Sequence, residues 1–154
     1  MKLISHRGNL TGPNKELENN PTYIINAINS GYDVEIDAWL DKDQNIYLGH
    51  DEPLYLIKKD FIKNNISRLW IHCKNIEMLY MLCTKIPESN FFWHENDKFT
   101  LTSKNIIWTY PGKEVTPVSV MVYLDPVPDG WETDDGMYGI CSDYIGRVKP
   151  KNGE

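Results

Sequence analysis

The feature that most limits the fold is a series of short apolar runs, spread along a chain of 154 residues. Each run is rich in β-branched or aromatic residues, which is the composition of a β-strand. The sequence therefore predicts eight strands, which contain residues 3–4, 34–36, 46–48, 69–71, 91–93, 106–108, 118–124 and 138–140.

Helices between these strands are marked by their end signals. The first begins with Asn20 as N-cap and Pro21 at the first helical position. The second begins after Asn75 and ends before Pro87, because proline cannot continue a helix. A third, weaker helix is predicted within residues 54–64.

Strands that alternate with helices indicate a parallel sheet, and eight of them indicate a TIM-type (β/α) barrel. Such barrels usually take about 250 residues, whereas this chain has 154. The later connections, residues 95–105 and 125–137, lack helical periodicity. We therefore predict a single α/β domain over residues 1–154. It is an abridged barrel with several outer helices missing and its active site at the carboxyl ends of the strands.

The connection between the second and third strands is too short for a parallel crossover. Residues 38–45 suit a hairpin, since a crossover needs about a dozen residues. If the turn centres between Asp43 and Gln44, Asp37 lies opposite His50 on the same face. This register predicts a carboxylate and an imidazole side by side.

All four histidines, His6, His50, His72 and His94, end an apolar run. The carboxyl ends of barrel strands form the active-site face, so we expect the four side chains to meet in one pocket. A single histidine is more often structural. Four at equivalent places favour a functional site.

Two further pairs of side chains offer ligands for a metal and a phosphate. Glu35 and Asp37 share one strand face, and two neighbouring carboxylates repel unless a cation lies between them. Their oxygens suit Mg²⁺ or Ca²⁺. His72 and Lys74 point together by the same alternation, while Cys73 points into the core. Each pair in isolation also fits an ordinary strand that ends in solvent.

Five motifs follow one another along the first third of the chain: His6-Arg7-Gly8, Glu18-Asn19, Glu35-Ile36-Asp37, Asp41-Lys42-Asp43 and His50-Asp51. Their order and spacing resemble the N-terminal signature of the glycerophosphodiester phosphodiesterase family. The resemblance covers about the first third of the chain, and residues 139–143 are similar to the family's last strand. It identifies the chain as a shortened member of the phospholipase C-like phosphodiesterase superfamily of TIM barrels.

The resemblance implies a metal-dependent phosphoric diester hydrolase that acts on a glycerophosphodiester-like or other small phosphodiester. It implies that His6 and His50 are the catalytic acid–base pair and that Arg7 contacts the phosphate. Glu35 and Asp37 would bind a divalent cation, Mg²⁺ or Ca²⁺.

One position departs from the family, which usually has a third carboxylate where this chain has His72. We assign His72 as the third metal ligand, and an imidazole there makes Mn²⁺ more acceptable. Lys74 matches the family's lysine and is assigned to the phosphate. Four further residues are assigned to the pocket: Glu18, Asp51, His94 and Asp143.

Three other functions use the same residue types. A lyase that resembles the phospholipase D-like toxins would form a cyclic phosphate, and the sequence does not separate that reaction from hydrolysis. A catalytically silent module would bind phosphate or metal alone, but it would need neither His6 nor His50 as a proton donor. A metal-dependent sugar isomerase or aldolase on a similar barrel would turn over a free sugar.

Charge and hydropathy exclude several classes of partner. The formal net charge of −6 argues against a nucleic acid. The three cysteines lack CxxC spacing, which indicates reduced thiols. The chain has neither an apolar N-terminal stretch nor an 18-residue apolar run. We expect a cytoplasmic protein with a small phosphodiester as its partner and no contact with membranes, and the sequence predicts no particular oligomeric state.

Overall fold

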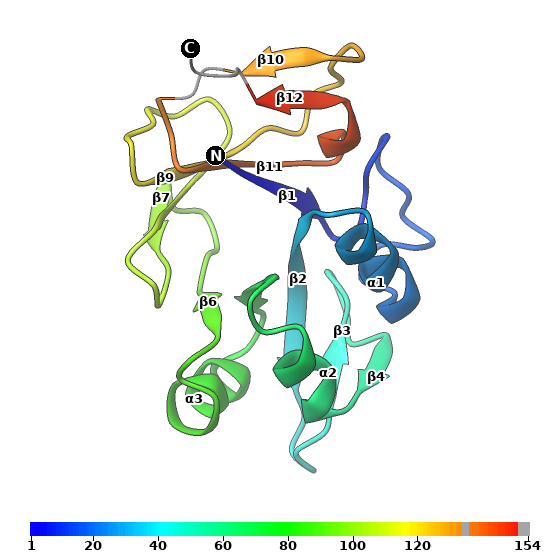
Figure 1. The fold of residues 1–154 in the computed structure, drawn as a ribbon. Coiled ribbons are helices and arrows are strands. Elements are labelled where there is room, and N and C mark those ends of the chain that lie inside the picture. The colour runs from blue at the N-terminus through cyan, green and yellow to red at the C-terminus, as the bar shows by residue number, and fades with distance from the viewer. Residues whose placement is uncertain (134–135, 151–154) are drawn as a thin grey trace.

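The centre of the fold is a ten-stranded sheet, in a computed structural model that describes residues 1–133 and 136–150 (Figure 1). Seven of the strands are mutually parallel and follow the order β6-β5-β2-β1-β11-β9-β8. Their bounds are β1 Lys2–His6, β2 Asp33–Leu40, β5 Leu69–Cys73, β6 Asn90–Phe92, β8 Ile107–Thr109, β9 Ser119–Val122 and β11 Gly139–Ser142.

Three antiparallel strands complete this sheet: β3 (Ile46–Leu48), β4 (Tyr55–Ile57) and β7 (Phe99–Leu101). A separate two-stranded sheet pairs β10 (Trp131–Thr133) with β12 (Val148–Pro150). All eight predicted strands are confirmed. Strands β4, β7, β10 and β12 were not predicted. β4 lies in the segment 54–64 that was predicted as a helix, and the short runs of β7, β10 and β12 are each interrupted by a polar residue.

The helices are few and lie mostly in the first half of the chain: α1 (Pro21–Asn29), α2 (Lys59–Asn64), α3 (Ile76–Lys85) and a 3₁₀ turn, η1 (Ile145–Arg147). The predicted caps are confirmed, because the Asn20 and Asn75 side chains accept hydrogen bonds from the first turns of α1 and α3. The helix predicted within residues 54–64 is shortened, since β4 takes its first part. Among the described residues, no helix is long and apolar enough to cross a bilayer.

The described strands do not close into a complete barrel, because β6 and β8 at the two ends of the parallel series do not pair. The ends nevertheless approach each other, and β6 and β7 lie on the same side of the molecule in Figure 1. The Ser103 amide donates to the Phe91 carbonyl oxygen at 2.8 Å, and the Ser103 hydroxyl accepts from the Phe91 amide at 3.1 Å. One residue, Ser103, thus bridges part of the gap between the two ends of the parallel series.

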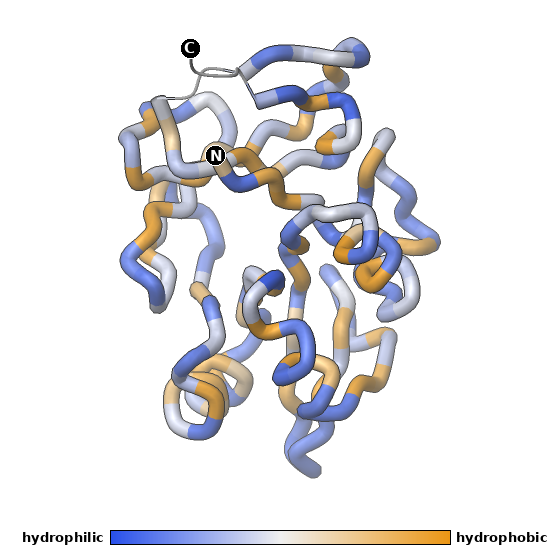
Figure 2. Tube along the Cα trace, in the orientation of Figure 1, coloured by the Kyte–Doolittle hydropathy of each residue, from blue (hydrophilic) through white to orange (hydrophobic). Residues whose placement is uncertain are grey.

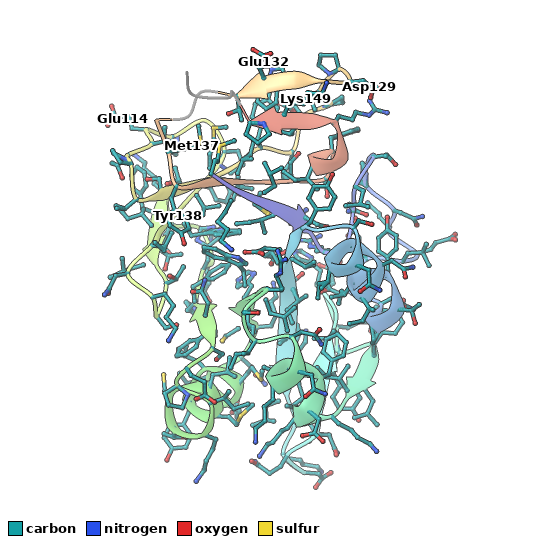
Figure 3. All side chains as sticks on the ribbon, in the orientation of Figure 1. Glu114, Asp129, Glu132, Met137, Tyr138 and Lys149 are labelled. Carbon is teal, nitrogen blue, oxygen red and sulfur yellow. The ribbon has the colours of Figure 1, made fainter. Side chains whose placement is uncertain are left out.

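Apolar clusters pack on both faces of the parallel strands, and Figure 2 shows hydrophobic residues along the strands and on the helix turns. Leu69, Ile71 and Cys73 of β5 belong to the cluster beneath the helices, so the core position predicted for Cys73 is confirmed. Trp70 points to the other face, into a cluster supplied by six strands. Tyr138, labelled in Figure 3, meets the Trp70 ring edge-on at 6.2 Å. Side-chain alternation therefore separates a helix-covered face from a central aromatic cluster.

The hairpin between β2 and β3 has a different register from the predicted one. The strands pair so that Asp43 lies at the centre of the turn. The Asp37 backbone carbonyl oxygen accepts a hydrogen bond from the Gly49 amide at 3.1 Å. His50 is therefore displaced by one residue from the position opposite Asp37. The cause is Asp41, whose carboxylate accepts from the backbone amide of Asp43 at 2.9 Å and sets the turn.

Gly49 begins the turn that returns the chain to the candidate site. Its φ of +151° is rare for other residues, and a Cβ there would overlap the backbone oxygen of Glu52. We expect Gly49→Ala to lower the free energy of unfolding by about 1–3 kcal/mol, because backbone rather than a flexible side chain must move. Gly31→Ala is the matched control, since Gly31 also has positive φ but open space around it. If urea denaturation gave the same loss of unfolding free energy for Gly49→Ala and Gly31→Ala, the overlap at Gly49 would be contradicted.

Candidate functional site

The carboxyl ends of the parallel strands open into a cavity of about 470 Å³. All four histidines line it, as the sequence analysis expected. His6 and His72 lie at the ends of β1 and β5, and His94 follows β6. His50 reaches the cavity by another route: β2 runs beyond β1, and antiparallel β3 brings the chain back towards the mouth. The convergence was predicted correctly, although β3 is not a parallel barrel strand.

Glu35, Asp37 and His72 form a tight cluster at this cavity; Glu35 and His72 line it, and Asp37 is fully buried beside them. One ligand atom from each lies within 4.8 Å of the others. The β2–β5 register places Asp37 beside His72, and His72 Nδ1 lies 3.0 Å from Asp37 Oδ1 and 3.9 Å from Glu35 Oε1. The predicted set of three metal ligands is therefore brought together.

The orientation of the His72 ring is fixed by its other nitrogen. Nε2 lies 2.8 Å from the His94 carbonyl oxygen, and a carbonyl only accepts, so Nε2 carries the donated proton. Nδ1 consequently faces the two carboxylates. Metal-binding histidines typically donate their second nitrogen to a backbone carbonyl in this way. The alternative is a second proton on Nδ1, which would make His72 an ion-pair partner of Asp37.

The ionic groups in and around this cluster carry more negative than positive charge. They include four carboxylates and two permanent cations: Glu18, Glu35, Asp37, Asp143, Arg7 and Lys74. Glu35 is 3% exposed and its Oε2 has no hydrogen-bond partner among the described residues. Buried carboxylates without compensation are costly. A divalent cation would supply the missing charge, so the residues present fit such an ion.

The two buried carboxyl groups differ in acidity. Burial raises the pKa of Glu35, and the neighbouring Asp37 charge raises it further. Burial also acts to raise the pKa of Asp37, but the close contact with His72 and the charge of Arg7 outweigh it, so that this pKa is lowered. Without a cation, Glu35 is therefore the more basic of the two carboxylates and Asp37 the more acidic.

Asp37 is held by Arg7, which itself lines the cavity, and by the buried Asn19. Arg7 Nε lies 3.0 Å from Asp37 Oδ2, while Arg7 Nη1 donates to Glu18 Oε2 at 3.1 Å. The Asn19 amide donates to Asp37 Oδ2 and its oxygen accepts from the Asp37 backbone, both at 2.9 Å. Arg7 and Asn19 both have positive φ, of 57° and 63°. These uncommon backbone conformations indicate that the surrounding contacts fix the site.

His6 is oriented by Asp143, which comes from β11's carboxyl end. β1 and β11 are parallel neighbours, and His6 Nδ1 lies 2.8 Å from Asp143 Oδ1. Asn9 also donates to Asp143 Oδ1, at 2.7 Å. Burial lowers the pKa of His6, but the Asp143 hydrogen bond and the Glu35 charge raise it above its ordinary value. His6 Nε2 is left facing Glu35, 3.9 Å from Oε2.

The remaining predicted residues divide into those that line the cavity and those behind it. Lys74 lines it, with Nζ 3.7 Å from Asp37 Oδ1. Glu18 and Asp143 are not part of the lining and instead hold Arg7 and His6. Asp51 is 92% exposed and accepts from His50 Nδ1 at 2.7 Å; it lines a neighbouring surface hollow rather than this cavity.

Two asparagines that organise the site, Asn9 and Asn19, were given no role from the sequence. Both are almost fully buried, and Asn9 joins Asp143 to Glu18 through its amide. Asn19 lies within a motif, but its partner Asp37 is 18 positions away. An asparagine in a loop normally signals a turn. Only the three-dimensional contacts reveal that these two support the carboxylates.

No protein-family model, curated protein or solved structure matches the chain. What the residues offer is a carboxylate–histidine cluster for a cation, an oriented imidazole and a lysine around one cavity.

Proposed function

We propose that this protein is a metal-dependent phosphodiesterase that hydrolyses a small phosphodiester. The observation that carries the proposal is the position of His6 beside the Glu35, Asp37 and His72 cluster, with its Nδ1 fixed by a carboxylate. An imidazole held in this way next to a set of metal ligands is typical of metal-assisted acid–base catalysis.

We also propose that the sheet is an incomplete (β/α) barrel. The parallel strands follow one another around the sheet in their chain order, from β1 through β2, β5 and β6 on one side to β8, β9 and β11 on the other. This is the strand order of a TIM barrel, in which functional groups gather at the carboxyl ends. The remaining gap lies beside β6, and Ser103 bridges part of it through its hydrogen bonds with the Phe91 backbone.

Glu35, Asp37 and His72 would hold the divalent cation, which supplies polarisation of a phosphoryl oxygen. Lys74 supplies a positive charge to the phosphate from the same wall. Arg7 has a smaller share of phosphate binding than the sequence predicted, since Asp37 and Glu18 engage its Nε and Nη1. Its main effect is to hold Asp37 in place.

His6 is the candidate that exchanges a proton with the reacting water or with the leaving group. Asp143 accepts the Nδ1 proton, which leaves Nε2 as the basic nitrogen towards the cavity. His50 is the second candidate. Its side chain is 40% exposed at the mouth, where it can protonate a departing alkoxide that is released to solvent.

The direct test is hydrolysis of bis(p-nitrophenyl) phosphate with Mg²⁺, Ca²⁺ or Mn²⁺ added. We expect release of p-nitrophenol that stops after exhaustive chelation and returns when the cation is restored, because the carboxylates need it to act on the phosphate. Activity that survives chelation would contradict the metal mechanism. This diester lacks a hydroxyl for internal attack, so a strictly cyclising lyase would not turn it over. A silent binding module would bind the cation without turnover.

A further inference from the structure

The lining of the cavity changes character along the strand order. β1, β2 and β5 supply the ionic groups already described, such as His6, Glu35 and His72. The segments at the ends of β6, β8 and β9 supply aromatic and aliphatic side chains: Trp93, Trp108, Tyr110, Pro111, Val122 and Leu124. The site therefore has an ionic half and an apolar half, which belong to neighbouring sectors of one sheet.

The apolar half extends from the central cluster to the mouth of the cavity. Trp108 and Val122 are buried, whereas Tyr110 and Leu124 are 46% and 38% exposed. Exposed large apolar side chains that adjoin buried ones in a cavity mark a binding surface more often than isolated ones do. Packing within the protein does not account for the exposed part of Tyr110 and Leu124.

His94 lies within this apolar half and has unused polar atoms. Both ring nitrogens are buried and have no hydrogen-bond partner among the described residues. The ring is 5.2 Å from that of Tyr110 and 6.2 Å from that of His72, measured between centroids. Buried polar atoms are normally satisfied, and a ligand in the cavity would provide the partner that the protein does not.

We propose that the substrate is a phosphodiester with an apolar organic group, aryl or alkyl, which packs against Trp93, Tyr110 and Leu124. The phosphate lies on the ionic half, near Lys74, and His94 meets a polar atom of the organic group. This inference rests on the proposed phosphodiesterase function and adds the chemical class of the ester to it. An ester with only small polar groups would leave the apolar half in contact with water.

Binding of phosphate monoesters in the presence of Mn²⁺, measured by isothermal titration calorimetry, tests the proposal without turnover. We expect phenyl phosphate or octyl phosphate to bind at least about tenfold more tightly than methyl phosphate, because burial of the ring or chain is added to the same charge. If phenyl phosphate binds more tightly than octyl phosphate, the preferred organic group is aryl. If octyl phosphate binds more tightly, the preferred group is an alkyl chain. Equal affinity for all three esters would overturn the proposal.

Variants at the mouth of the cavity test whether the apolar half causes the tighter binding of the phenyl or octyl ester. Tyr110→Ala and Leu124→Ala should each weaken the preferred ester about three- to tenfold while methyl phosphate changes by less than about twofold. Tyr80→Ala and Leu56→Ala are matched controls, because both residues are exposed, at 69% and 61%, and neither lines the cavity. An equal loss in the control variants would overturn the assignment of the apolar half.

The same measurements distinguish failure of this inference from failure of the proposed function. Metal-dependent hydrolysis with equal binding of the three monoesters would overturn the apolar substrate alone. Tighter binding of the phenyl or octyl ester, lost in Tyr110→Ala, without any hydrolysis would support the apolar half and overturn the phosphodiesterase.

Discussion

Glu35→Gln and Asp37→Asn are each expected to lower metal-dependent phosphodiesterase activity by about 10³-fold. A bound cation contributes several kcal/mol of transition-state stabilisation, and each 1.36 kcal/mol corresponds to a factor of ten in rate. Both carboxylates belong to one cluster of ligands, so loss of either one removes most of the effect. The double variant should therefore lose little more than the single ones.

The measurements are kcat/KM on bis(p-nitrophenyl) phosphate and the dissociation constant for Mn²⁺. Affinity for Mn²⁺ should fall in both variants, which is a readout independent of turnover. Glu95→Gln is the matched control, because Glu95 lines the same cavity but is exposed and outside the ligand cluster. Losses that multiply in the double variant, or an unchanged affinity for Mn²⁺, would show that Glu35 and Asp37 do not share a cation.

His6→Ala is expected to lower kcat by roughly 10²–10⁴-fold while affinity for Mn²⁺ changes little. This range is the usual contribution of a general acid or base, and His6 contacts the ligand cluster only at 3.9 Å, through Glu35. Thermal denaturation would verify that the variant is folded. Wild-type kcat in a folded His6→Ala protein would eliminate His6 as a proton-transfer group.

Asp143→Asn and His94→Ala show whether the effect of His6 is specific. Asp143 positions the ring through Nδ1, so Asp143→Asn should lower kcat less than His6→Ala and alter its pH profile. His94 also lines the cavity, but no carboxylate among the described residues hydrogen-bonds to its ring nitrogens. His94→Ala should raise KM more than it lowers kcat. Equal losses of kcat in His6→Ala, Asp143→Asn and His94→Ala would show that any substitution at the cavity lowers the rate, and would contradict a specific role for His6.

Local patterns in the sequence were sufficient for most of the elements of the fold. The eight predicted strands follow from short β-branched and aromatic runs, and α1 and α3 from the capping signals of Asn20 and Asn75. Alternation placed Glu35 and Asp37 on one face and Cys73 on the other. These signals are local, since propensity, capping and side-chain direction depend on residues only a few positions apart.

Contacts between distant residues were decided by the tertiary structure. His6 and Asp143 are 137 positions apart, and their hydrogen bond exists because β1 and β11 are neighbours in the sheet. The position of His50 depends on the turn set by Asp41, which shifted the predicted register by one residue. Neither the neighbour of a strand nor its register can be read from the strand's own alternation, which repeats every two residues.

The sequence by itself thus determined which side chains share a face and which residues could serve as ligands. The tertiary structure decided that Glu35, Asp37 and His72 meet, that Asp143 orients His6, and that an apolar half borders the ionic one. The physical reason is that side-chain direction is fixed by the local backbone. Proximity across a sheet is fixed instead by backbone pairing and core packing, whose free energy is gained only when distant segments come together.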